Sequence, residues 1–159
     1  MTTFIESLDI LNTKGSVIHK LNEDEFVRLD ISTLKRKDME KILNAINVEA
    51  YTMLILDNIG LRNPAAIQNY KLSKSFNLTN WKEHFIEFPD TPYPVKYIEV
   101  KHIKPSEIIR YFTNIKHQQS CPLVVKFMSD RTLIRITPFS IDVVSEDKGL
   151  LSKLKEFSD

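Results

Sequence analysis

Apolar and polar residues alternate along this chain with two different periods, and each period predicts a different kind of element. Residues 26–31 alternate apolar and polar side chains, which indicates a strand. Residues 35–47 instead follow the helical period. The apolar positions that define this helical face are Met39, Ile42, Leu43 and Ile46. A strand followed by an amphipathic helix is therefore predicted near the start of the chain.

The same two periods predict most of the later elements. A second amphipathic helix is expected after Pro105, which suits a first helical position. Its apolar face comprises Ile108, Tyr111, Phe112 and Ile115. Strands are predicted over residues 51–56, 95–103, 123–128, 132–137 and 140–144, and a terminal helix over 149–157. Weaker patterns predict a hairpin over residues 4–21 around Gly15 and a return strand that begins at Leu61. They also predict short strands over 67–72 and 75–78 and a short helix over 80–87.

The order strand, helix, strand, turn, strand occurs twice, about 70 residues apart. In this comparison the first helix face aligns with the second, Met39 with Ile108 and Leu43 with Phe112. The repeat predicts an α+β domain in which two helices lie on one face of an antiparallel sheet. A pseudo-twofold axis would then superpose residues 26–62 on residues 97–135.

These segments resemble one domain of a DNA sliding clamp of the PCNA type. The resembling stretches are the first helix at 37–46, the hairpin at 54–61, the strand and short helix at 76–85, and the strand and helix at 97–109. The resemblance implies two β-α-β-β-β halves whose helices face DNA. Such clamp chains carry two domains of this kind, whereas 159 residues have room for one.

Domain boundaries follow from the same reading. Three prolines within six residues, Pro89, Pro92 and Pro94, predict a stiff connector between the two halves. The expected organisation is an N-terminal hairpin extension over 1–25, a single clamp-like domain over 26–145 with halves 26–88 and 95–145, and a C-terminal helix over 146–159.

Composition narrows the functional classes. A net charge of +1 excludes a polycation but permits a local basic face. Cys121 is the only cysteine, which excludes an intrachain disulfide and a four-cysteine zinc site. With three glycines, no glycine-rich phosphate loop can be built. The N-terminus lacks the basic region of a signal peptide and no 18-residue apolar run exists, so we expect a protein of a reducing compartment, cytoplasmic, nucleoid or nuclear.

Basic residues cluster on the two predicted helices. They are Lys35, Arg36, Lys37 and Lys41 on the first helix and Lys104, Arg110, Lys116 and His117 on the second, with Lys101 nearby. If the helices lie side by side, these residues would form one strip against DNA phosphates, with contacts that are salt-dependent and independent of base sequence. The alternative is an ordinary solvated helix face. Asp38, Glu40 and Glu107 dilute the strip.

The resemblance implies a non-catalytic DNA replication or repair accessory protein, a processivity or scaffold subunit. We also expect self-association, because one such domain cannot encircle a duplex and its outermost strands would present unpaired edges. A twofold dimer is favoured over a closed ring, and a monomer is the remaining alternative. Aromatic residues around the proline connector would either close the core or form an apolar pocket for a replication or repair partner. These are Trp81, Phe85, Phe88 and Tyr93. The alternative from another class is a protein-binding regulator or inhibitor that keeps the fold without binding DNA.

A magnesium-dependent nuclease is a further alternative. Asp90, Glu99 and Lys101 have the spacing of a PD-(D/E)xK motif, in which two carboxylates hold the metal and the lysine positions water. Pro92 and Pro94 follow Asp90 closely and disfavour a continuous strand there. The four histidines show no metal-ligand spacing, so no metal or cofactor is expected.

Overall fold

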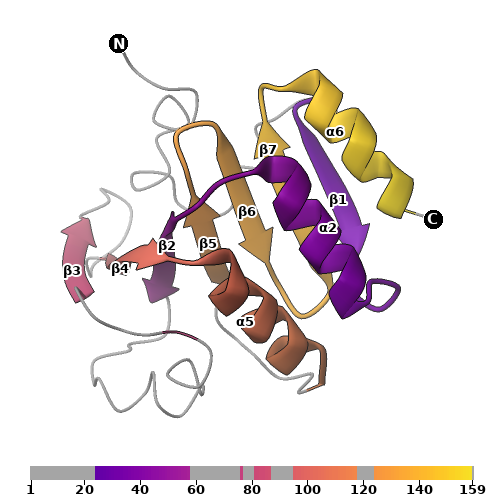
Figure 1. The fold of residues 1–159 in the computed structure, drawn as a ribbon. Helices are drawn as coiled ribbons and strands as arrows, with labels where there is room; N and C mark the ends of the chain where they lie inside the picture. The colour runs from indigo at the N-terminus through magenta and orange to yellow at the C-terminus, as the bar shows by residue number, and fades with distance from the viewer. Residues whose placement is uncertain (1–23, 58–75, 77–80, 87–94, 118–123, 159) are drawn as a thin grey trace.

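The computed structural model describes residues 24–57, 76, 81–86, 95–117 and 124–158 of the chain (Figure 1). Its elements in chain order are β1 (Phe26–Asp30), α2 (Arg36–Ile46), β2 (Tyr51–Asp57), β3 (Trp81–Ile86), β4 (Val95–Ile103), α5 (Pro105–His117), β5 (Val124–Met128), β6 (Thr132–Ile136), β7 (Ser140–Ser145), α6 (Lys148–Leu154) and the 3-10 turn η2 (Lys155–Phe157). None of the described helices is long and apolar enough to cross a membrane.

The described strands form one seven-stranded sheet in the order β1-β7-β6-β5-β2-β4-β3, and every neighbouring pair is antiparallel. The helices α2, α5 and α6 lie together on one face of this sheet (Figure 1). The predicted α+β class, the antiparallel sheet and the placement of two helices on one face are confirmed. The C-terminal helix is confirmed as well, and it joins the same layer.

The two long helices begin with the same arrangement. The Lys35 backbone N–H donates to the Asp38 carboxylate at 2.8 Å, and the Lys104 backbone N–H donates to the Glu107 carboxylate at 2.8 Å. In both cases an acid three residues into the helix satisfies a backbone N–H at its start. At its end, α2 stops at Asn47, which adopts a left-handed conformation with φ of 58° and donates to the Leu43 carbonyl.

One hydrophobic core fills the space between the helices and the sheet. The residues that the helical period assigns to the inner faces are buried, including Met39, Ile42 and Leu43 on α2 and Ile108 and Phe112 on α5. Leu151 and Leu154 of α6 belong to the same core cluster. Each fully buried side chain of this size contributes about 1.5–3 kcal/mol, so the core fixes the orientation of both helices.

The strand order shows that a twofold axis does not relate the two halves. The connection β1–α2–β2 passes over three strands, whereas β4–α5–β5 passes over only β2. The predicted superposition of residues 26–62 on 97–135 therefore does not describe the whole sheet. The physical reason is that β4 pairs directly with β2, while its counterpart β1 pairs with β7 at the far edge.

One predicted element is wrong and several lie outside the described residues. Residues 81–86 form strand β3 rather than the short helix predicted over 80–87. Trp81 and Phe85 are four residues apart, and that spacing places two residues on one face of a helix or of a strand, so it could not separate the two structures. The hairpin predicted over 4–21 and the strand pieces at 61 and 67–72 lie outside the described residues.

Candidate nucleic-acid interface

The outward faces of α2 and α5 carry the basic residues that the sequence placed there. Lys37 and Lys41 are exposed on α2, and Arg110 is exposed on α5. They lie opposite the buried positions of their helices by the helical period of 100° per residue. Among the described residues, none of these three side chains forms an ion pair. Their charges are therefore free to meet an external anion.

Lys116 joins the two helices and places them side by side. Its ammonium group donates a hydrogen bond to the backbone carbonyl of Leu34, just before α2 begins. Because Lys116 lies in the last turn of α5, the two helices, which also pack against each other, run in opposite directions (Figure 1). This half-buried lysine is thus a structural link, and it is less available to an external phosphate than the exposed residues.

The antiparallel arrangement distributes the remaining predicted residues over both ends of the helix pair. Lys35 and Arg36 are exposed at the start of α2, near Lys116, whereas Lys104 is exposed at the start of α5, at the other end. Arg36 forms an ion pair with Glu40 at 3.4 Å, and its side chain is 70% exposed. An exposed pair of this kind contributes about 0–1 kcal/mol, so Arg36 can exchange its partner for a phosphate at small cost.

Charge is segregated between the helical layer and the rest of the chain. The helices and the residue before each of them contain ten basic residues, Lys35, Arg36, Lys37, Lys41, Lys104, Arg110, Lys116, Lys148, Lys153 and Lys155. They contain five acidic residues, Asp38, Glu40, Glu107, Asp147 and Glu156. The layer therefore carries +5 within a chain of net charge +1, which leaves −4 for the remainder. The near-zero total conceals a basic face.

The structure tests only part of the predicted partner pocket. Phe85 lies on the outer strand β3 and is 64% exposed. Trp81 begins the same strand, and its side chain lies outside the described residues, as do Phe88, Tyr93 and the side chain of His117. The described residues thus place one exposed aromatic side chain at the sheet edge, and the pocket itself stays a prediction.

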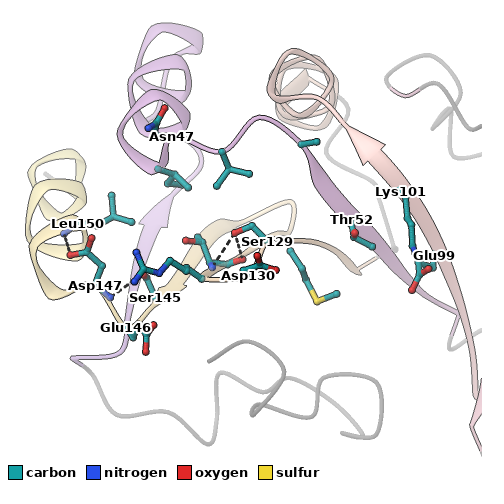
Figure 2. Close-up of a pocket in the computed structure, with 16 residues that line it drawn as sticks. Asn47, Thr52, Glu99, Lys101, Ser129, Asp130, Ser145, Glu146, Asp147 and Leu150 are labelled. Atoms are coloured by element: carbon teal, nitrogen blue, oxygen red, sulfur yellow. Dashed lines mark hydrogen bonds between the residues drawn. The ribbon is translucent and has the colours of Figure 1, made fainter. Parts of the chain in front are cut away.

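An open groove of about 1010 Å³ lies at the end of the sheet, between α2, α6 and the β5–β6 turn (Figure 2). Glu99 and Lys101, two members of the nuclease motif, line it together with Asp130 and Glu146. The third member, Asp90, lies outside the described residues. In the part of the chain that the structure describes, no three His, Cys, Asp or Glu side chains are grouped so as to hold a metal ion.

The sheet face opposite the helices holds a charged cluster that sequence reasoning missed. Asp142 on β7 is 0% exposed and accepts hydrogen bonds from Arg28 Nε at 2.7 Å and from Arg135 Nη1 at 3.1 Å. These contacts raise the pKa of Arg28 above its usual value. Lys126 on β5 is 4% exposed, and burial, assisted by the charge of Arg135, lowers its pKa to about 8.

A sequence signal for this cluster does exist. Each of the four strands carries a charged residue at a position that alternates with buried apolar residues, such as Arg28 between Val27 and Leu29. That alternation indicates which side chains share the far face of the sheet. It does not indicate which strands are neighbours, so the convergence of the four residues could not be read from the pattern.

Comparison of the chain with protein-family models, with curated proteins and with solved structures found no match in any of the three.

Proposed function

We propose that this protein is a non-catalytic DNA accessory protein that contacts the phosphates of double-stranded DNA through α2 and α5. The observation that carries the proposal is the alignment of exposed Lys37, Lys41 and Arg110 on two adjacent antiparallel helices. The surplus of five positive charges in the helical layer adds to the attraction. Contacts of this kind to phosphates depend on salt and do not read base sequence.

The role that fits such contacts is a processivity or scaffold subunit, which must stay on DNA without recognising a particular site. The clamp resemblance of the sequence and the placement of both helices on one face of an antiparallel sheet support this role. The exposed Phe85 at the sheet edge is a candidate contact for a replication or repair partner. Acidic residues within the layer, such as Glu40 and Glu107, favour weak and reversible contact by a single chain.

Reversing the three outward charges tests the proposal. We expect the variant Lys37→Glu, Lys41→Glu and Arg110→Glu to bind duplex DNA more weakly at low salt. Because each lost phosphate contact removes about one unit from the slope of log affinity against log salt, the slope should become shallower by about three units. Fluorescence anisotropy of a labelled duplex across a salt series measures both quantities, and circular dichroism verifies that the variant is folded.

A matched variant distinguishes phosphate contacts made by the strip from a general effect of net charge on DNA binding. Lys82→Glu with Arg131→Glu reverses two exposed charges outside the helical layer, and it is matched in net charge by the double variant Lys37→Glu with Lys41→Glu. We expect this control to retain the salt slope of the wild type. Equal weakening in both double variants, or unchanged binding in the double variant of the strip, would contradict a phosphate-binding strip.

We also expect the protein to self-associate. The outer strands of the described sheet are β1 and β3, and each has a hydrogen-bonding edge that no described strand pairs. Such edges pair readily with another chain, and a twofold dimer is the simplest closed arrangement. Light scattering during size exclusion measures the mass. A single-chain mass at every concentration would contradict self-association and favour a monomeric binding module.

A protein-binding regulator or inhibitor is the second candidate. The observation that favours it is the groove at the end of the sheet, which combines apolar side chains such as Val48 and Met128 with carboxylates such as Asp130 and Glu146. DNA retention that does not change in the charge-reversal variant would support this second function over the first.

A further inference from the structure

The charged cluster on the far face belongs to a row that runs across all seven strands. Residues that pair directly in neighbouring strands project from the same face of a sheet. From β1 to β3, the directly paired residues are Arg28, Asp142, Arg135, Lys126, Leu54, Glu99 and Lys82. The first four are consecutive neighbours, and they comprise three cations and one carboxylate.

The carboxylate of Asp142 neutralises only part of the positive charge in this row. Its two oxygens accept hydrogen bonds from Arg28 and from Nη1 of Arg135. Lys126, directly opposite Arg135, has Leu54 as its neighbour on the other side. Three positive charges around one buried carboxylate leave a surplus of two.

One hydrogen-bond donor in this cluster lacks an acceptor. The Nε–H of Arg135 is buried and has no hydrogen-bond partner among the described residues. Lys126, directly opposite on β5, is 4% exposed, and no described carboxylate forms an ion pair with it. Buried donors and charges normally have partners, because leaving them unpaired costs several kcal/mol for a charged group. The unpartnered guanidinium donor of Arg135 and the ammonium charge of Lys126 lie on adjacent strands, so one anionic acceptor between them would satisfy both.

The structure assigns to Lys126 and Arg135 a binding site for a small oxyanion of the phosphate type. A tetrahedral oxyanion offers several acceptor oxygens, so one ion can accept from the ammonium group and from the guanidinium Nε–H together. The near-complete burial of Lys126 limits the ligand to a small ion. This site lies on the sheet face opposite α2 and α5, so it does not depend on DNA binding.

Inorganic phosphate is the probe. Thermal and urea unfolding are measured as phosphate replaces chloride at constant ionic strength, and ³¹P line broadening detects binding directly. For a single site, the folding equilibrium constant should rise in proportion to phosphate above its dissociation constant, tenfold for each tenfold increase. Lys126→Met, which keeps the volume and removes the charge, should abolish both the rise and the line broadening.

Lys82→Met is the control, because it makes the same charge change at an exposed position of the same row. It should respond to phosphate as the wild type does. Phosphate also stabilises proteins generally by exclusion from their surface, and that effect does not require Lys126. If the folding equilibrium constant rises equally in the wild type and in Lys126→Met, or does not rise in the wild type, the proposed oxyanion site is contradicted.

A second variant keeps the test decisive if Lys126→Met does not fold. Arg135→Lys retains the positive charge beside Asp142 and removes the guanidinium Nε–H. We expect at least a tenfold loss of phosphate affinity from this variant, measured by ³¹P titration. Unchanged affinity would remove Arg135 from the site and overturn the assignment.

Discussion

Replacing Asp142 by alanine is expected to lower the free energy of unfolding by about 3 kcal/mol. The carboxylate is completely buried and is the only acidic group in contact with Arg28 and Arg135 within the described residues. Without it, two guanidinium groups and the neighbouring Lys126 would repel one another. Removing one partner of a buried ion pair costs about 3–5 kcal/mol, and the lower end applies because the Arg28 side chain is 52% exposed.

Urea unfolding followed by circular dichroism measures this change, with Glu146→Ala as the matched control because Glu146 is exposed. We expect the control to change stability by less than about 0.5 kcal/mol. A triple variant, Arg28→Met, Arg135→Met and Asp142→Leu, should recover most of the loss, because apolar residues of similar volume can replace a buried charge cluster. A loss below about 1 kcal/mol for Asp142→Ala would mean that the two arginines do not depend on this carboxylate.

The stability of the wild-type protein is expected to rise as the pH increases from about 8 to about 10. The pKa of Lys126 is lowered to about 8 by burial, whereas an unfolded lysine has a pKa of about 10.4. Between these values the unfolded chain binds more protons than the folded chain, so raising the pH favours folding. The gain should reach about 2 kcal/mol between pH 7 and pH 10.

The charged groups nearest to Lys126 in its row are Arg135, followed by Asp142 and Glu99 one strand further on either side. Guanidinium and carboxylate groups do not ordinarily titrate in this range, so the slope should report the lysine. Lys126→Met should remove the rise. Equal pH profiles for the two proteins, in buffer free of phosphate and sulfate, would contradict a buried charged lysine.

Tyr51 limits the pH range over which the effect of Lys126 on stability can be measured. Burial raises the pKa of its hydroxyl far above that of an exposed tyrosine, which is about 10. Above that pH the unfolded chain loses a proton that the folded chain keeps, and stability falls again. The pH titration should therefore be compared between the two proteins only up to about pH 10.

The local pattern of apolar residues was sufficient to predict the amphipathic helices and the faces that they bury. The helical period of Met39, Ile42 and Leu43 predicted the buried face of α2, and therefore predicted that Lys37 and Lys41 project outward. The same reasoning placed Arg110 on the outer face of α5. Both predictions are confirmed, because the side chains of one amphipathic helix are related by its geometry alone.

Residues 81–86 show where a local pattern fails. Trp81 and Phe85 are equally compatible with a helix and a strand, and pairing with β4 is what makes this segment the strand β3. Pairing is a long-range interaction, and the same holds for the position of β4 beside β2. Neither could be deduced from apolar spacing, so the twofold relation suggested by the repeat was not realised in the sheet.

The sequence by itself therefore determined the helices, the helix faces and most of the strands of this protein, because these depend on neighbours a few residues apart. Only the tertiary structure decided that Arg28, Asp142, Arg135 and Lys126 meet in one row, because they come from four strands up to 114 residues apart. Strand alternation specifies a face of the sheet, whereas strand order and register specify the neighbours on that face. The excess of positive charge around Asp142 therefore results from strand order and register.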